Sequence, residues 1–205
     1  MGIKISVLLS GSGTTLQNII EHIEAGRIDG KICCVVSSRA GAYGLERARK
    51  HGIRAVEVPR KNYADVASFN EGLWAEVMQC PPDLVVLAGF MSLLTVPPGM
   101  ENRILNVHPA LIPAFCGHGM YGHHVHEAVL AFGAKITGAT VHFVDAEYDH
   151  GPIVMQGAVP VLDDDTPDTL AERVQAKERE LYPQAIQLFA EGRLSVVENR
   201  VKVRT

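Results

Sequence analysis

The fold is decided by residues 3–26, which read IKISVLLSGSGTTLQNIIEHIEAG. The apolar run over residues 3–9 predicts a buried β-strand, and the glycine- and hydroxyl-rich segment after it predicts a tight turn. Apolar residues then recur at helical spacing over residues 16–23, and Gly26 marks the end of the helix. The stretch is therefore a strand, a glycine turn and a helix in succession.

The rest of the chain continues this alternation. The apolar run at residues 84–87 is typical of a parallel strand buried on both faces. A proline at position 183 is expected to kink or interrupt the last helix. The patterns predict strands at 32–36, 55–58, 135–144 and 153–161, helices at 43–51, 66–78 and 125–132, a long helix from 167, and a hairpin at 195–203.

Together these elements indicate the α/β class. We expect one Rossmann-like, three-layer domain over residues 1–205, with a mostly parallel twisted sheet of about seven strands flanked by helices. A C-terminal hairpin is possible in addition. Splitting a chain of 205 residues into two domains would make each half small, so a single core is favoured.

The composition is that of an ordinary soluble globular protein. Hydrophobic residues make up 47%, charged residues 20%, and the net charge is −4, so nothing suggests a nucleic-acid or membrane partner. The N-terminal apolar run is too short for a membrane span and lacks the features of a signal peptide. Four cysteines without a CxxC pair indicate reduced thiols and a cytoplasmic location.

The segment from Gly11 to Thr15 joins the first strand to the first helix. Backbone N–H groups and the positive end of a helix dipole form an anion site at such a junction. The segment lacks the lysine of an NTPase loop and the third glycine of a dinucleotide motif, so a phosphate monoester is the favoured ligand. The alternative is that the glycines only turn a tight corner.

A second candidate site begins at residues 104–115, ILNVHPALIPAF. If this segment starts as a strand, its period of two places Asn106 and His108 on the same side. An amide donor beside an imidazole suits acyl transfer, because one binds a developing oxyanion and the other moves a proton. Asp149 could orient that imidazole. The alternatives are a strand end for the pair and a turn residue for Asp149.

Other polar residues have structural interpretations. His142 lies in a strand-like run and fits a core histidine. Glu178 falls on the same helical stripe as Val174 and Leu181, where it could reach water or pair with an arginine. The histidines between residues 117 and 126 are expected on the surface of a mobile, glycine-rich loop, without a metal site; they are His118, His123, His124 and His126.

Four motifs carry a resemblance to a known family: SGSGTTL at 10–16, LAGFM at 87–91, NVHPALIP at 106–113, and VHFV at 141–144 followed by DHGP at 149–152. In order and spacing they resemble the folate-dependent glycinamide ribonucleotide formyltransferases. The superfamily also contains methionyl-tRNA formyltransferase and formyltetrahydrofolate deformylase. The phosphate loop favours the first branch, and the extra domains of the other two are not expected here.

The resemblance implies a reaction and its catalytic residues. The amine of 5'-phosphoribosylglycinamide would attack the formyl group of 10-formyltetrahydrofolate, giving a tetrahedral intermediate and then tetrahydrofolate and a formamide, in de novo purine (IMP) biosynthesis. Asn106 would bind the oxyanion, His108 would act as general acid, and Asp149 would orient His108 and help to remove the amine proton. No metal is expected, and the partners are small molecules, with the protein a monomer or homodimer.

The resemblance also implies binding residues. Glu178 would contact the substrate amine or ribose. Ser92 and Val66 stand where many relatives carry arginine, so contacts to the folate tail are expected to be weaker. Separately, Cys116 replaces a frequent proline. A hydrolase, or a non-catalytic sugar-phosphate-binding protein, is the alternative function. The substrate phosphate would meet Gly11, Ser12, Gly13, Thr14 and Thr15, and the folate would meet Met91, Ser92, Leu93, Leu94, Val144 and Asp145.

Overall fold

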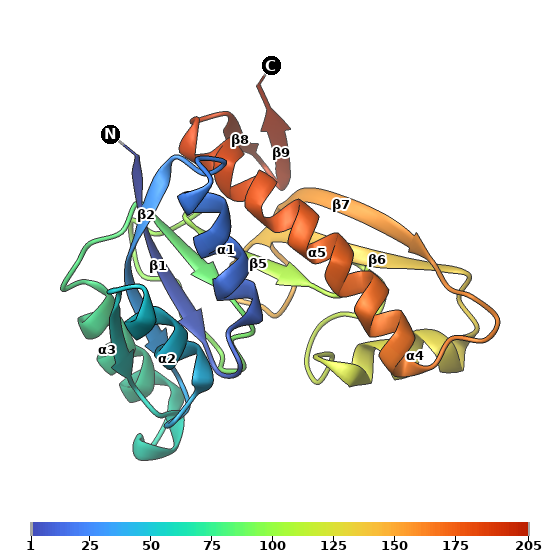
Figure 1. Cartoon of the computed structure of the whole chain (residues 1–205), viewed down its shortest axis with the longest axis horizontal. Helices are drawn as coiled ribbons and strands as arrows, with labels where there is room; N and C mark the ends of the chain where they lie inside the picture. Colours follow the sequence, from blue (N-terminus) through green and yellow to red (C-terminus); the bar gives the residue numbers. More distant parts are fainter. Residues whose placement is uncertain (1, 205) are drawn as a thin grey trace. The chain divides into compact units, whose positions relative to one another are not determined.

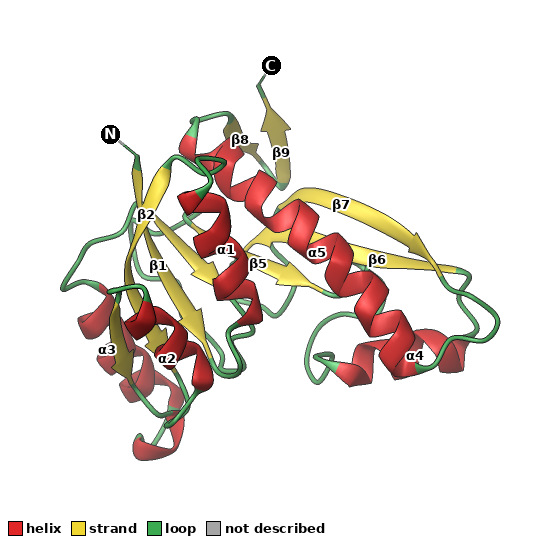
Figure 2. Ribbon diagram, viewed as in Figure 1, coloured by secondary structure: helices red, strands yellow, loops and turns green. Residues whose placement is uncertain are grey.

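The structure is a computed structural model that describes residues 2–204 (Figure 1). Strands and helices alternate along most of the chain (Figure 2), as the sequence predicts. The chain forms two compact units, Met1–Leu105 and Asn106–Thr205, and the boundary falls inside strand β5 (Ile104–His108). The strand order is β3-β2-β1-β4-β5-β6-β7, with β8 and β9 in a separate hairpin.

The first unit is built on parallel strands. β1 pairs in parallel with β2 and β4, and β2 pairs in parallel with β3. Five residues of β1 are buried, as expected for an apolar strand covered on both faces. The strands are β1 (Ile3–Leu9), β2 (Gly30–Ser37), β3 (Arg54–Glu57) and β4 (Leu84–Leu87), and the helices are α1 (Thr14–Glu24), α2 (Tyr43–Lys50), the short η1 (Arg60–Asn62) and α3 (Val66–Val77).

Local chemistry accounts for the helix ends in this unit. Asp65 caps α3, because its carboxylate accepts the backbone N–H of Ser68 at 2.8 Å. Gly26 has a φ of 68° just beyond α1, a left-handed conformation that glycine adopts without steric cost. The predicted helices and strands of this unit are confirmed, with ends that differ by one or two residues.

The second unit contains an antiparallel strand pair under a long helix. β6 (Ile136–Phe143) pairs antiparallel with β7 (Ile153–Pro160), and helix α5 (Pro167–Ala190) packs on both strands and on α4 (His123–Phe132) (Figure 1). The chain ends in the predicted hairpin, β8 (Leu194–Val197) and β9 (Arg200–Val203), turned by Glu198 with a φ of 56°.

Helix α5 passes through Pro183. Thr166 caps the helix and Pro167 occupies its first turn, and of the two outcomes expected at Pro183, a kink or an interruption, the interruption does not occur. Pro183 is buried, and so are Leu181, Tyr182, Ala185 and Ile186 around it. Their burial stabilises the helical path by more than the loss of one backbone hydrogen bond costs, which a sequence pattern does not reveal.

The predicted α/β class, the mostly parallel sheet of seven strands with flanking helices, and the C-terminal hairpin are confirmed. The prediction of a single domain over residues 1–205 stays a prediction. Within residues 2–204, none of the helices combines the length and the apolar character that a membrane crossing requires.

Candidate active site

The glycine segment of the first unit forms the junction between β1 and α1. Gly13 is the residue before the first helical turn, with a φ of 74°, and no side chain caps the helix there. Ser12 and Thr14 are exposed, whereas Gly13 is buried. Ser10 anchors the start of the segment, since its hydroxyl lies 2.6 Å from that of Ser38 and accepts the backbone N–H of Met91 at 2.9 Å.

Gly13 must be glycine for a second reason. A Cβ at this position would lie 2.6 Å from the Cα of Gly44 in α2, closer than non-bonded carbon atoms approach. The positive φ and the contact with Gly44 therefore both exclude side chains here. The resulting loop leaves the first N–H groups of α1 available to an anion.

In the second unit, β5 presents Asn106 and His108 on one side, and Asp149 lies beside both. Asp149 Oδ1 lies 3.4 Å from Asn106 Nδ2, and Asp149 Oδ2 lies 3.3 Å from His108 Nδ1. Asp149 also accepts the backbone N–H of Gly117 at 3.0 Å and has a φ of 54°. The three residues proposed from the sequence therefore lie together, although Asp149 is 41 residues from His108.

His142, which the sequence suggests only as a core histidine, belongs to the same cluster. It is buried at the end of β6, and its Nδ1 lies 2.8 Å from the carbonyl oxygen of Phe143. A carbonyl only accepts, so Nδ1 carries the hydrogen, and in the neutral ring Nε2 accepts from Asn106 Nδ2 at 3.1 Å. His142 thus fixes the orientation of the Asn106 amide. The feature of the sequence that could have pointed to His142 is its place at the end of a buried strand, just before an acidic loop.

The surroundings shift the pKa values of both His108 and Asp149 downward. Burial lowers the pKa of His108, although the charge of Asp149 and the carbonyl of Phe115 oppose this. Burial raises the pKa of Asp149, but the contact with His142, whose Nε2 lies 3.6 Å from Oδ1, the charge of His108 and the N–H of Gly117 outweigh it, so the net shift is downward. Both ring nitrogens of His108 face acceptors, because Nε2 lies 2.8 Å from the Phe115 oxygen. The Phe115 carbonyl only accepts, so Nε2 carries the hydrogen of the neutral ring, and a second proton, on Nδ1, is directed at Asp149 at 3.3 Å.

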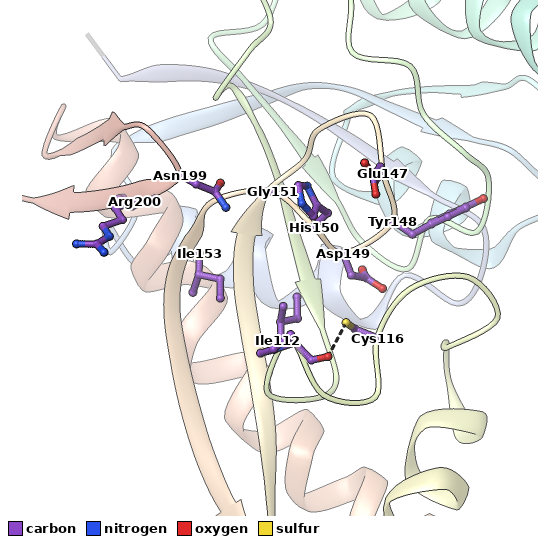
Figure 3. Close-up of a pocket in the computed structure, with 12 residues that line it drawn as sticks. Ile112, Cys116, Glu147, Tyr148, Asp149, His150, Gly151, Ile153, Asn199 and Arg200 are labelled. Carbon is purple, nitrogen blue, oxygen red and sulfur yellow. Dashed lines mark hydrogen bonds between the residues drawn. The ribbon is translucent and has the colours of Figure 1, made fainter.

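A pocket of about 640 Å³ lies next to this cluster in the second unit (Figure 3). Asp149 lines the pocket and also faces His108, so the carboxylate connects the buried imidazole with an open space. The hairpin contributes to the wall through residues 199–201. The lining residues are Ile112, Pro113, Cys116, Glu147, Tyr148, Asp149, His150, Gly151, Ile153, Asn199, Arg200 and Val201.

The histidine segment differs from the expected surface loop. His118, His123 and His124 are exposed, but His126 is only 3% exposed, and three of the four histidines lie on α4 or at its start. Burial lowers the pKa of His126. The helix places its fourth residue inward, which the expectation of a glycine-rich loop missed. Among residues 2–204, no group of three or more His, Cys, Asp or Glu side chains is arranged to hold a metal ion.

Glu178 lies half-buried on α5, on the stripe shared with the buried Val174 and Leu181. Burial raises the pKa of Glu178 to about 7, against the opposing charge of Arg179. A carboxyl group with this pKa changes charge near neutral pH. Such a group is a candidate for contact with an amine.

This pKa predicts a pH-dependent stability. Between the ordinary pKa of 4.5 and the folded value of about 7, the folded chain keeps a proton that the unfolded chain has lost. Stability should therefore fall as pH rises through this window, by about 1–3 kcal/mol, since one pKa unit is about 1.4 kcal/mol. Urea unfolding at pH 5 and pH 8 should show that Glu178→Gln reduces this fall. The exposed Glu180→Gln should retain it, and equal pH dependence in all three proteins would contradict the assignment.

The folate-binding candidates are placed on two loops. Met91 is exposed, Ser92 and Leu93 are half-buried, and Leu94 is buried in the first unit. Val144 and Asp145 follow β6 in the second unit, where Asp145 accepts the N–H of Glu147 at 2.9 Å. The roles of all these residues stay predictions.

A mostly parallel α/β fold with a carboxylate that contacts both an amide and an imidazole suits a group-transfer enzyme. The chain belongs to the formyl transferase family, whose model matches residues 3–186. It is 38% identical to the phosphoribosylglycinamide formyltransferase of Haemophilus influenzae, over 96% of this chain and 91% of that protein. The Escherichia coli enzyme of the same name is 39% identical over the same shares.

A solved structure supports membership of the same family. Glycinamide ribonucleotide transformylase 1 from Symbiobacterium toebii superposes with a TM-score of 0.93 and 45% sequence identity, covering 100% of this chain and 95% of that one. The resemblance predicted from the four motifs is thereby confirmed.

Proposed function

We propose that this enzyme transfers the formyl group of 10-formyltetrahydrofolate to the amine of 5'-phosphoribosylglycinamide, giving formylglycinamide ribonucleotide and tetrahydrofolate in purine biosynthesis. The likeness to phosphoribosylglycinamide formyltransferases over 96% of the chain supports the reaction. The observation that carries the chemistry is the contact of Asp149 with both Asn106 and His108.

The proposed mechanism assigns one step to each of these side chains. The substrate amine attacks the formyl carbon, and the formyl oxygen becomes an oxyanion that the Asn106 amide stabilises. His108, held by Asp149, donates a proton to this centre, and Asp149 helps to remove the proton of the attacking amine. The open pocket beside Asp149 gives water access to the carboxylate for this proton. Collapse of the intermediate breaks the bond between the formyl carbon and the folate nitrogen, and the proton lost by the amine ends on that nitrogen, which gives tetrahydrofolate and the formamide.

The remaining residues bind the two substrates. Gly11, Ser12, Gly13, Thr14 and Thr15 hold the phosphate through the N–H groups at the start of α1 and their own hydroxyl groups. The folate is held by Met91, Ser92, Leu93, Leu94, Val144 and Asp145. Glu178 contacts the amine or the ribose, and its pKa of about 7 suits a carboxyl that pairs with an ammonium group.

We also propose that the enzyme works in the cytoplasm on small molecules, as a monomer or homodimer without a metal. The free thiols of Cys33, Cys34, Cys80 and Cys116 suit a reducing compartment. Neither nucleic acid nor membrane is a partner in this proposal.

Hydrolysis of 10-formyltetrahydrofolate is the second candidate, because water could take the place of the amine in the same cluster. The release of tetrahydrofolate should be measured with and without glycinamide ribonucleotide. The transferase predicts release that depends on the ribonucleotide. Release at an equal rate without it would identify a hydrolase, and no release under either condition would favour a sugar-phosphate-binding protein.

A further inference from the structure

We propose that Arg47 is a positioning residue for substrate phosphate, acting by holding the Ser12 carbonyl so that the loop N–H groups face the anion. The inference rests on the proposed phosphate loop and adds to it a residue from a different helix. Arg47 is half-buried on α2, and its Nε donates to the Ser12 carbonyl oxygen at 2.9 Å. Its Nη1 lies 3.4 Å from the side-chain oxygen of Gln17 in α1.

The geometry of the peptide bond explains the effect. In a trans peptide, the carbonyl of one residue and the N–H of the next point in opposite directions. The Gly11 carbonyl accepts the N–H of Gly44 at 3.1 Å, and the Ser12 carbonyl accepts from Arg47, so both carbonyls face α2. The N–H groups of Ser12 and Gly13 must then point away from α2.

These two N–H groups precede the uncapped start of α1. Neither donates to another group among residues 2–204. Successive N–H groups that point to one side form a concave anion site, to which the N–H groups of the first helical turn add. Without Arg47, the Ser12 peptide could rotate and present its carbonyl to the anion, which would repel it.

Arg47 is itself held in place. Its guanidinium carbon lies 5.1 Å from the centre of the Tyr43 ring, within the range of a cation–π contact. The close packing of Gly13 against Gly44 sets the spacing between the loop and α2. Both contacts keep the positive charge beside the loop, where it also favours an anion.

The test separates binding of the ribonucleotide from catalysis. Arg47→Met should raise the KM for glycinamide ribonucleotide by about tenfold or more, since a charged hydrogen bond is lost. The kcat and the KM for 10-formyltetrahydrofolate should stay near wild type. Arg49→Met is the matched control, because Arg49 lies on the same helix and its side chain pairs with the exposed Glu46 instead of with the loop. An Arg47→Met variant indistinguishable from this control would overturn the inference.

Two further measurements sharpen the result. Arg47→Lys keeps the charge but loses the fixed Nε donor, so it should restore the KM only in part; full restoration would refute the role in holding the carbonyl. Calorimetric binding of ribose 5-phosphate does not depend on turnover. A weaker affinity in Arg47→Met than in Arg49→Met would support the inference even if the wild type failed to formylate the ribonucleotide, which would refute only the proposed function.

Discussion

Replacement of His108 by alanine is expected to lower kcat by about two to four orders of magnitude, the usual loss when a general acid is removed. The His108 ring lies on β5 with its Nδ1 at 3.3 Å from the Asp149 carboxylate, which holds it in place as the proton donor of the proposed mechanism. No neighbouring side chain in the cluster can replace it, since His142 uses its Nδ1 hydrogen on the Phe143 carbonyl. Steady-state kinetics with both substrates measures the change.

The binding of a phosphate ligand provides the control. The glycine loop lies in the first unit, so the affinity for ribose 5-phosphate should stay near wild type in His108→Ala. His118→Ala, in which an exposed histidine is removed, should keep full turnover. Because His108 is buried, His108→Gln serves as a second variant with less loss of packing. Wild-type kcat in both folded His108 variants would show that the ring is not catalytic.

Substitution of Gly13 by aspartate should abolish tight binding of the ribonucleotide while affecting folate binding far less. The Cβ would meet the Gly44 Cα at 2.6 Å, and the φ of 74° is unfavourable for a side chain. The carboxylate would also place a negative charge where the phosphate binds. The expected loss is at least about a hundredfold in affinity, since lost charge-assisted hydrogen bonds cost about 1.5–3 kcal/mol each. Calorimetry with each ligand separates the two affinities.

Two variants separate the effect of the negative charge from the effects of backbone strain and steric clash. Gly26→Asp lies beyond the other end of α1 at a φ of 68° and meets no atom within 4 Å, so it carries the backbone strain without the clash or the charge at the loop. Ser12→Asp adds the charge at an exposed position whose backbone already carries a side chain. Ser12→Asp should weaken ribonucleotide binding and Gly26→Asp should not. Equal loss of folate and ribonucleotide affinity in Gly13→Asp would refute the phosphate assignment.

Much of the fold follows from the sequence because the strands and helices repeat with clear periods. The β4 strand matches its prediction at both ends, since four apolar residues follow two prolines. The sequence leaves open whether Pro183 interrupts the helix, because packing against other elements decides whether a helix continues through a proline. His126 is misjudged for a similar reason, as its burial depends on how α4 packs.

The candidate site was predictable only in part. Asn106 and His108 share a strand, so local periodicity places them together. The contact of Asp149 with His108 depends on tertiary structure, so the residues alone offered it as one of two interpretations, and the motif resemblance favoured it. The contributions of His142 and Arg47 could not be predicted, because each acts through a partner on another element.

The central claim is that the formyl group moves from the folate to the ribonucleotide amine. The most direct test uses 10-formyltetrahydrofolate labelled with carbon-13 in its formyl group, together with glycinamide ribonucleotide, and follows the label by NMR. The account predicts that the label appears in the formamide of the product, one for one with the tetrahydrofolate released. Recovery of the label as free formate, with the ribonucleotide unchanged, would contradict it.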